Sequence, residues 1–246
     1  QNMINIYVYK NHLEQQVQEQ TAVLRKAYEK LEKQKERVEK LNKDILDMLG
    51  TIVEFRNLES GEHIMRVKGY TKILAEKFKE LYPEYNLTDE TIDNIVEASA
   101  LHDLGKISIP DKILLKPGKL TKEEFEYMKL HTVKGCELIQ AVNLEQSEEL
   151  KQICYDIIRY HHERYDGKGY PDGLKGDEIP VSAQLVSLAD VYDALINERC
   201  YKDAFSNEKA FNMIMNGECG TFSPKLLETF KQVRDKFERF AIEERK

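Results

Sequence analysis

Residues 13–55 read LEQQVQEQTAVLRKAYEKLEKQKERVEKLNKDILDMLGTIVEF, a segment with no proline and only one glycine. Apolar side chains recur along it every seven residues, in two registers. The first register contains Val17, Leu24, Leu31, Val38, Ile45 and Ile52, and the second contains Leu13, Gln20, Ala27, Gln34, Leu41, Met48 and Phe55. A repeat of seven winds two helices into a left-handed coiled coil, and β-branched residues in the first register favour a parallel pair. The sequence therefore predicts a coiled-coil helix over residues 1–55 that forms a parallel homodimer.

The competing interpretation is a single amphipathic helix that packs on its own domain. We favour the dimer, because more than 40 residues without a break are too many for one small domain to cover. The repeat begins close to Gln1, and a parallel helix pair can act as a mechanical link between domains. We expect a sensor or receiver domain upstream, whose last helix would include Ile4, Ile6, Tyr7, Val8 and Tyr9.

The remaining residues, 56–246, place apolar positions at helical spacing, and few segments alternate as strands do. Thr121 with Glu124 forms a capping box that predicts a helix through His131 to Leu138, and Ser223-Pro224 marks a second helix start. Further helices are expected over residues 64–78, 92–101, 150–158 and 181–196, with another from near Ser206. Residues 166–180, rich in glycine and proline, predict a long ordered loop. The fold class is all-α, with a helical domain at 56–246 preceded by the long amino-terminal helix.

The composition excludes several classes of protein. With 37 Lys and Arg against 44 Asp and Glu, the net charge of −7 argues against binding to a nucleic-acid polymer. No window holds 18 apolar residues, so no membrane span is expected. The cysteines form no CxxC pair, which favours reduced thiols in a cytoplasmic protein over a disulfide or a cysteine metal site. They are Cys136, Cys154, Cys200 and Cys219.

Histidines and carboxylates carry the candidate chemistry. His102-Asp103 and His161-His162 each follow an apolar helix, where burial of unpaired polar groups would be costly. A lone histidine at a helix end is usually structural, but here eight nitrogen and oxygen ligands are available without a thiolate. They are Glu59, His63, His102, Asp103, His131, His161, His162 and Asp190. Such a set suits iron, manganese or zinc, and its size implies two or three ions, an arrangement that favours attack on a phosphoryl centre.

The same residues lie in motifs of a known family. His102-Asp103, the run HHERYDGKGYP at residues 161–171 and the run ADVYDAL at residues 189–195 resemble the HD-GYP subgroup of the HD phosphohydrolases. The resemblance covers about residues 46–240. It implies an HD-type helical bundle and a bacterial signalling phosphodiesterase that hydrolyses cyclic di-GMP to pGpG or GMP. The amino-terminal helix resembles the one that joins a receiver domain to this output domain in two-component response regulators.

The resemblance also implies roles for single residues. The eight ligands would bind two or three divalent ions, with iron or manganese as the working metal. Asp103 would bridge ions, and Glu59 is similar to the carboxylate of three-metal members. Lys106 would contact the scissile phosphate, and Tyr170, Arg199 and Lys202 would hold the dinucleotide. Departures from the family pattern at Asn57, Ser60 and Cys200 leave the substrate preference and the number of metals open.

Three functional interpretations follow. In the main one, a metal-activated hydroxide attacks the phosphorus of cyclic di-GMP, with Asp103 and Lys106 as catalytic residues. In the second, the same pocket holds a cyclic dinucleotide without useful turnover and signals through a partner protein. In the third, the enzyme acts on another cyclic dinucleotide, such as cyclic GMP-AMP. Structural alternatives also stay open, because Tyr170 could be a packing tyrosine, and Arg199 and Lys202 could be solvated surface charges.

Overall fold

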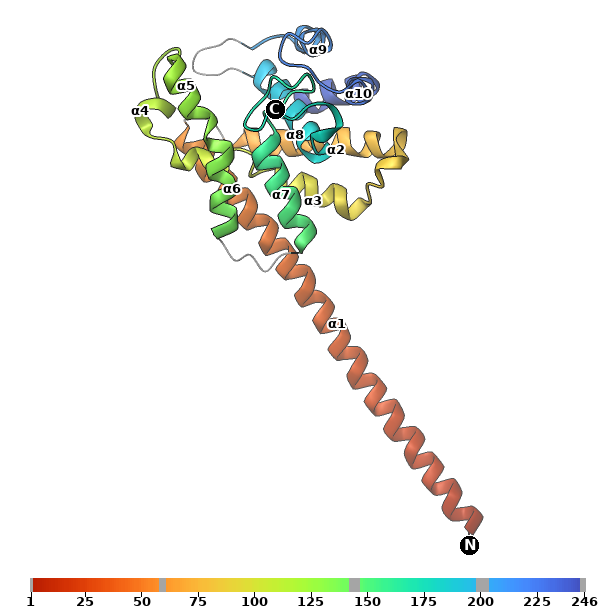
Figure 1. Ribbon diagram of the computed structural model, residues 1–246. Coiled ribbons are helices and arrows are strands. Elements are labelled where there is room, and N and C mark those ends of the chain that lie inside the picture. The colour runs from red at the N-terminus through yellow and green to blue at the C-terminus, as the bar shows by residue number, and fades with distance from the viewer. Residues whose placement is uncertain (1, 58–60, 142–146, 198–203, 244–246) are drawn as a thin grey trace. The chain divides into compact units, whose positions relative to one another are not determined.

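The structure is a computed structural model and describes residues 2–57, 61–141, 147–197 and 204–243, with side chains from residue 9 onward. The elements in these ranges are helices, with no β-strand among them, which confirms the all-α prediction. The chain divides into two compact units, residues 1–45 and 46–246 (Figure 1). In the described ranges, no helix combines the length and the apolar character that crossing a membrane requires.

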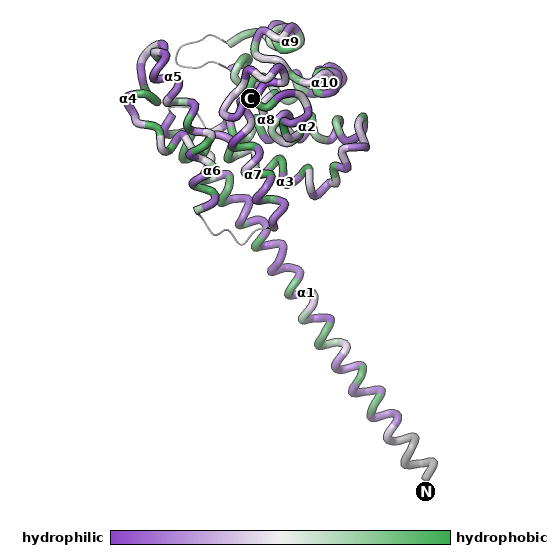
Figure 2. The backbone as a smooth tube through the Cα atoms, in the orientation of Figure 1, coloured by the Kyte–Doolittle hydropathy of each residue, from purple (hydrophilic) through white to green (hydrophobic). Residues whose placement is uncertain are grey.

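Helix α1 (Asn2–Arg56) is one continuous helix that belongs to both units. Within the first unit the apolar residues of both heptad registers are exposed, for example Val17 at 53%, Leu24 at 70% and Leu31 at 63%. Figure 2 shows these hydrophobic positions spaced along α1 between hydrophilic ones. Ion pairs four residues apart, such as Arg25 with Glu29, lie on the polar surface of the helix. The pairing of α1 with a second copy of the chain in a coiled coil stays a prediction.

The second unit packs around helix α2 (Glu62–Leu81), which has its most extensive contacts with three other helices. They are α3 (Asp89–Ser99), α8 (Val181–Ile196) and α10 (Pro224–Glu243). Fully buried aromatic rings join these helices, among them Tyr70 of α2, Tyr192 of α8 and Phe237 of α10. Each large apolar side chain removed from water contributes about 1.5–3 kcal/mol to the free energy of unfolding. This core fixes the orientation of the helices that carry the histidines and aspartates predicted as ligands.

Helix α7 (Glu148–Tyr160) packs against α3, α6 (His131–Ala141) and α8, and α9 (Asn207–Met215) packs against α8. Shorter elements connect the long helices. They are the 3-10 helices η1 (Pro83–Tyr85), η2 (Leu104–Ser108) and η3 (Gly176–Glu178) and the one-turn helix α4 (Asp111–Leu114). Ser147 and Ser206 accept hydrogen bonds from the first-turn amides of α7 and α9, as N-cap residues do. The predicted starts near Ser206 and at Pro224 are confirmed.

One helix prediction was wrong. The segment after the Thr121 capping box forms two helices, α5 (Lys122–Lys129) and α6 (His131–Ala141), which break at Leu130. In one continuous helix the carbonyl of Met128 would accept the amide of Thr132. Here that carbonyl accepts Nδ1 of His131 instead, at 2.8 Å. The break therefore lets the His131 ring turn into the polar centre of the unit.

Candidate metal centre

Seven of the eight predicted ligands lie in the described residues, and five separate segments carry them. His63 is in the first turn of α2, His102 and Asp103 follow α3, and His131 begins α6. The remaining three are His161 and His162 directly after α7 and Asp190 within α8. Glu59 lies outside the described residues. Segments separated along the chain thus bring their nitrogen and oxygen atoms to one place.

The seven side chains form two neighbouring groups. In the first, ligand atoms of Asp103, His131, His161 and His162 lie within 4.8 Å of one another. The second consists of His63, His102 and Asp190, under the same distance limit. Each group offers three or four ligand atoms, which is enough to hold one metal ion and leave coordination positions open for water or substrate.

Asp103 lies between the two groups. Its Oδ1 is 3.3 Å from Nε2 of His131 and 3.8 Å from Nε2 of His161. Its Oδ2 is 3.3 Å from Nε2 of His102, whose Nε2 lies 4.0 Å from Oδ1 of Asp190. One carboxylate oxygen therefore faces each group, which is the arrangement of a carboxylate that bridges two ions.

Hydrogen bonds fix the orientation of four imidazole rings. Nδ1 of His102 donates to the Ser99 carbonyl at 2.8 Å, and Nδ1 of His161 donates to the Ile157 carbonyl at 2.9 Å. His131 donates to the Met128 carbonyl in the same way. A carbonyl only accepts, so each Nδ1 carries a proton and Nε2 is the atom left to bind a metal. The rings are held in the tautomer that binds a metal through Nε2.

The fourth ring is held by a carboxylate. Nδ1 of His63 donates to Oδ2 of the buried Asp193 at 2.7 Å, while Nε2 of His63 lies 3.6 Å from Oδ1 of Asp190. The guanidinium of Arg66 binds the same carboxylate, with Nε 2.7 Å from Oδ1. A carboxylate behind a metal-binding histidine fixes the ring and raises its basicity.

The residues fit a divalent metal. Nε2 of His102, His131 and His161 and Oδ1 of Asp103 are buried, and within the described part of the chain they have no hydrogen-bond partner. A buried polar atom without a partner costs about 1–3 kcal/mol, so four in one place require an explanation. Their lone pairs converge, and a cation would satisfy them together. The cluster and its nitrogen and oxygen chemistry thus indicate a divalent metal site.

The electrostatics of three rings and of Asp103 favour the protonation states that metal ligands need. Burial and the nearby His102 lower the pKa of His161 to about 3, and burial also lowers the pKa of His131 and His162. These rings are neutral at pH 7. Burial lowers the pKa of His102, but the neighbouring carboxylates Asp103 and Asp190 outweigh it and raise that pKa to about 9. Burial alone would raise the pKa of Asp103, but Lys106 and His102 outweigh it and hold that pKa well below its usual range. The Asp103 carboxylate is therefore ionised.

Lys106 is the cation closest to this carboxylate. Its Nζ lies 2.5 Å from Oδ2 of Asp103, and its side chain is only 15% exposed. Lys106 belongs to η2, the short helix that continues directly from Asp103. A mostly buried ammonium beside the ligand groups can stabilise negative charge on a bound phosphate.

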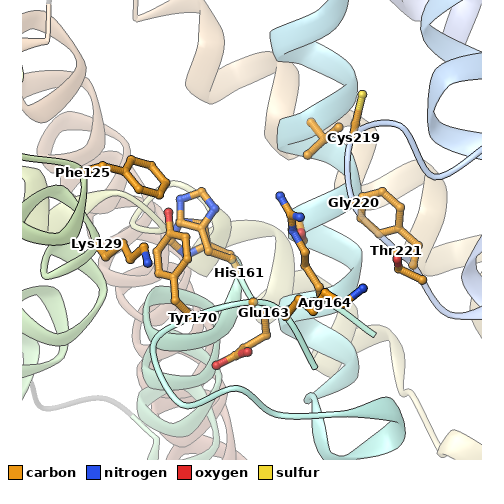
Figure 3. Close-up of a pocket in the computed structure, with 15 residues that line it drawn as sticks. Phe125, Lys129, His161, Glu163, Arg164, Tyr170, Cys219, Gly220 and Thr221 are labelled. Carbon is orange, nitrogen blue, oxygen red and sulfur yellow. The ribbon is translucent and has the colours of Figure 1, made fainter. Parts of the chain in front are cut away.

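A cavity of about 440 Å³ opens beside His161 and His162. Figure 3 shows Phe125 and Lys129 along one side of it and Arg164 with the loop at Gly220 and Thr221 along another. Its volume lies in the range of small-molecule sites, and three of its lining residues, Lys129, Arg164 and Lys168, are basic. The cavity can hold an anionic ligand of small-molecule size next to the ligand groups.

Tyr170 lines this cavity, and its ring lies against that of His162, with centroids 4.7 Å apart and planes tilted by 31°. Its loop is held by Glu163, which is buried and accepts the backbone amides of Asp172 at 2.7 Å and Gly173 at 2.9 Å. The loop predicted over residues 166–180 is therefore ordered by a side chain that follows the histidine pair directly. The other two predicted substrate contacts, Arg199 and Lys202, lie outside the described residues.

Sequence reasoning missed several residues of the cavity wall. Phe125 and Lys129 come from α5, and Thr221 comes from the loop before α10, where no motif marks them. Arg164 lies inside the histidine-pair motif but was not selected as a site residue. The spacing of Phe125 and Lys129, four residues apart on one face of α5, was the one available signal.

Comparison with known proteins gives one family and a consistent set of relatives. Residues 60–226 match the family model described as HD domain. A probable cyclic di-GMP phosphodiesterase of Vibrio cholerae is 39% identical over 238 residues, 92% of this chain and 51% of that protein. A 3′3′-cGAMP-specific phosphodiesterase of the same organism is 38% identical over 80% of this chain and 35% of its own length.

Among solved structures, a cyclic GMP-AMP-specific phosphodiesterase of Vibrio cholerae aligns with a TM-score of 0.57 at 16% identity, over 83% of this chain and 51% of that one. At that identity the likeness concerns the fold alone. The chain spans about half the length, or less, of the curated relatives it matches.

Proposed function

The chain belongs to the HD domain family, and from this premise we propose that it is a metal-dependent phosphodiesterase that hydrolyses cyclic di-GMP to pGpG or onward to GMP. The main support is that two ligand groups lie on either side of the Asp103 carboxylate, beside a cavity with basic walls. Similarity to proteins named cyclic di-GMP phosphodiesterases supports the substrate.

The ligands fit two or three divalent ions, and iron or manganese are the metals we propose. Two adjacent ions supply Lewis acidity and lower the pKa of water to near neutrality. His63, His102 and Asp190 would hold one ion, and His131, His161 and His162 another, with Asp103 between them. Glu59 would add a third position. The lack of any thiolate among these residues supports iron or manganese over a structural zinc site.

The chain's own residues orient the substrate and balance its charge. Lys106 would pair with a non-bridging oxygen of the scissile phosphate, because its ammonium already lies beside Asp103. Tyr170 offers an aromatic wall, and Arg199 and Lys202 would hold the rest of the dinucleotide. The hydrogen bonds of the histidine Nδ1 atoms keep the ligand geometry fixed, so little reorganisation is needed as charge develops.

For the domain organisation, we propose that residues 1–55 form a parallel coiled coil between two copies and that residues 56–246 form the catalytic domain. The exposed heptad positions of α1 support this, because an unpaired apolar stripe of that length is unfavourable in water. A sensor or receiver domain would act on the catalytic domain through α1. A cytoplasmic location would give the enzyme access to its second-messenger substrate.

The test is anaerobic incubation of metal-analysed protein with cyclic di-GMP and, in parallel, with 3′3′-cGAMP, with products separated by chromatography. We expect pGpG or GMP from cyclic di-GMP at a rate that follows the iron or manganese content, and no product from Asp103→Ala. Faster turnover of 3′3′-cGAMP would assign the enzyme to the second substrate. Bound metal with both substrates intact would identify a binding module instead.

A further inference from the structure

The last two turns of α1 lie against the segment that carries His102, Asp103 and Lys106. At Gly50 the two backbones touch, since a Cβ there would lie only 2.3 Å from the carbonyl oxygen of Ala100. Glu54, one turn later, is fully buried, and its charge is one of those that raise the pKa of His102. The end of helix α1 therefore packs against the segment that carries these ligands, within the second unit.

Arg56, the last residue of α1, binds the far end of the same segment. Its Nη1 donates to the carbonyl of Lys106, and its Nη2 donates to the carbonyl of Ile109, both at 2.7 Å. Nη2 also lies 2.7 Å from Oδ1 of the exposed Asp111. A guanidinium is a rigid planar fork, so the two carbonyl bonds fix the η2 backbone relative to α1. A lysine ammonium has no such fixed fork and would hold the two carbonyls less rigidly.

On the side away from α1, helix α6 packs tightly against η2. A Cβ at Gly105 would lie 1.8 Å from the carbonyl oxygen of His131 and 2.5 Å from the amide nitrogen of Gly135, so η2 packs backbone to backbone on α6. The segment is thus enclosed between α1 and α6. A shift of the last turn of α1 must move it or break the Arg56 bonds.

We propose that Arg56 is a positioning residue, which holds η2 so that the Lys106 ammonium stays against Asp103 and makes catalysis depend on the placement of α1. This inference rests on the proposed phosphodiesterase function. Arg56 contacts neither the ligand groups nor the cavity in the described structure; it acts through the Lys106 backbone. Its side chain is 31% exposed, so its replacement leaves no large apolar cavity.

The test compares Arg56→Gln and Arg56→Lys with the matched control Asp111→Asn, all in the full chain. Asp111→Asn removes only the exposed ion pair and leaves both carbonyl bonds intact. Metal content, thermal midpoint, and kcat and KM for cyclic di-GMP and for bis(p-nitrophenyl) phosphate are measured on each. A second readout is the rate at which acetic anhydride labels Lys106, followed by mass spectrometry, with the exposed Lys112 as the internal reference.

For Arg56→Gln we expect kcat to fall by about tenfold to a hundredfold at unchanged metal content and KM, since small displacements of a reacting group have effects of that size. Arg56→Lys should lie between it and the wild type, and Asp111→Asn should match the wild type. Labelling of Lys106 should rise about fivefold in Arg56→Gln, as its ion pair loosens. The proposal would be overturned if Arg56→Gln had the same kcat and the same rate of Lys106 labelling as the wild type. It would also be overturned if the loss of kcat were fully explained by a lower metal content or a lower thermal midpoint.

The two proposals fail in different ways. If the wild type does not cleave cyclic di-GMP, the proposed function fails, while Lys106 labelling in the metal-free protein still tests Arg56. If the wild type cleaves it and Arg56→Gln does so equally well, the positioning role fails alone.

Discussion

Replacing Asp193 by asparagine should weaken metal binding without touching a ligand. The buried carboxylate of Asp193 accepts Nδ1 of His63 at 2.7 Å and binds Arg66 through Nε at 2.7 Å and Nη2 at 3.1 Å. The amide oxygen of asparagine can still accept from His63, so the ring keeps its orientation and loses only the negative charge behind it. Loss of such a supporting group costs about 10–100-fold in metal affinity, or about 1.4–2.7 kcal/mol.

The same change affects stability through Arg66, whose side chain is only 9% exposed. Removing one partner of a buried pair destabilises by about 3–5 kcal/mol, and we expect about 3 kcal/mol because Glu62 remains as a second partner at 3.3 Å. The assays are calorimetric titration of the apoprotein with Mn²⁺ and urea unfolding of the metal-free protein.

Glu62→Gln is the matched control. Glu62 is 75% exposed, so its ion pair with Arg66 should contribute less than about 1 kcal/mol, and the metal affinity should not change. Wild-type Mn²⁺ affinity in Asp193→Asn, alongside the expected loss of stability, would refute the reasoning. Asp193 would then serve Arg66 and not His63.

Three further changes have defined outcomes. Glu163→Ala leaves two loop amides without their acceptor, and in steady-state assays it should raise KM for cyclic di-GMP more than KM for bis(p-nitrophenyl) phosphate. Glu163→Gln keeps an acceptor and should have the smaller effect. Equal KM values in the wild type and both variants would contradict this. Leu31→Lys should convert the coiled-coil dimer to a monomer in sedimentation experiments at unchanged metal content, and a dimer that persists would argue against the heptad interface. Addition of Mn²⁺ at about 100 times its Kd should raise the free energy of unfolding in urea by about 2.7 kcal/mol per site, and no rise would mean that the folded site does not bind it.

Local sequence signals predicted most of the fold because they act within one helix. Helix α8 begins at Val181 and ends at Ile196 as predicted, since Pro180 precedes a continuous apolar pattern. The break at Leu130 could not be predicted in this way. No proline or glycine marks it, and the Met128 carbonyl accepts the His131 ring at the break, a contact that no local sequence signal encodes.

The candidate site was predictable in its members but not in its arrangement. Seven of the eight residues singled out from the sequence and the family resemblance lie together in the described structure, but neither source indicated their division into two groups. The bond from Asp193 to His63 joins residues 130 positions apart, and the bonds from Arg56 to η2 join residues about 50 apart. No periodicity encodes such pairs, because they form only when helices of the core pack.

The dispersal of the ligands along the chain has a consequence for folding. His63 and Asp190 are 127 positions apart (190 minus 63), yet they belong to one ligand group. An ion held by both closes a loop of that length, and closing such a loop in an unfolded chain costs about 4 kcal/mol in entropy. The metal would therefore act as a crosslink between the amino-terminal and carboxyl-terminal halves of the domain. A metal that binds only the folded chain cannot help folding to begin. Once it is bound, however, unfolding requires either its release or an unfolded chain that keeps the closed loop.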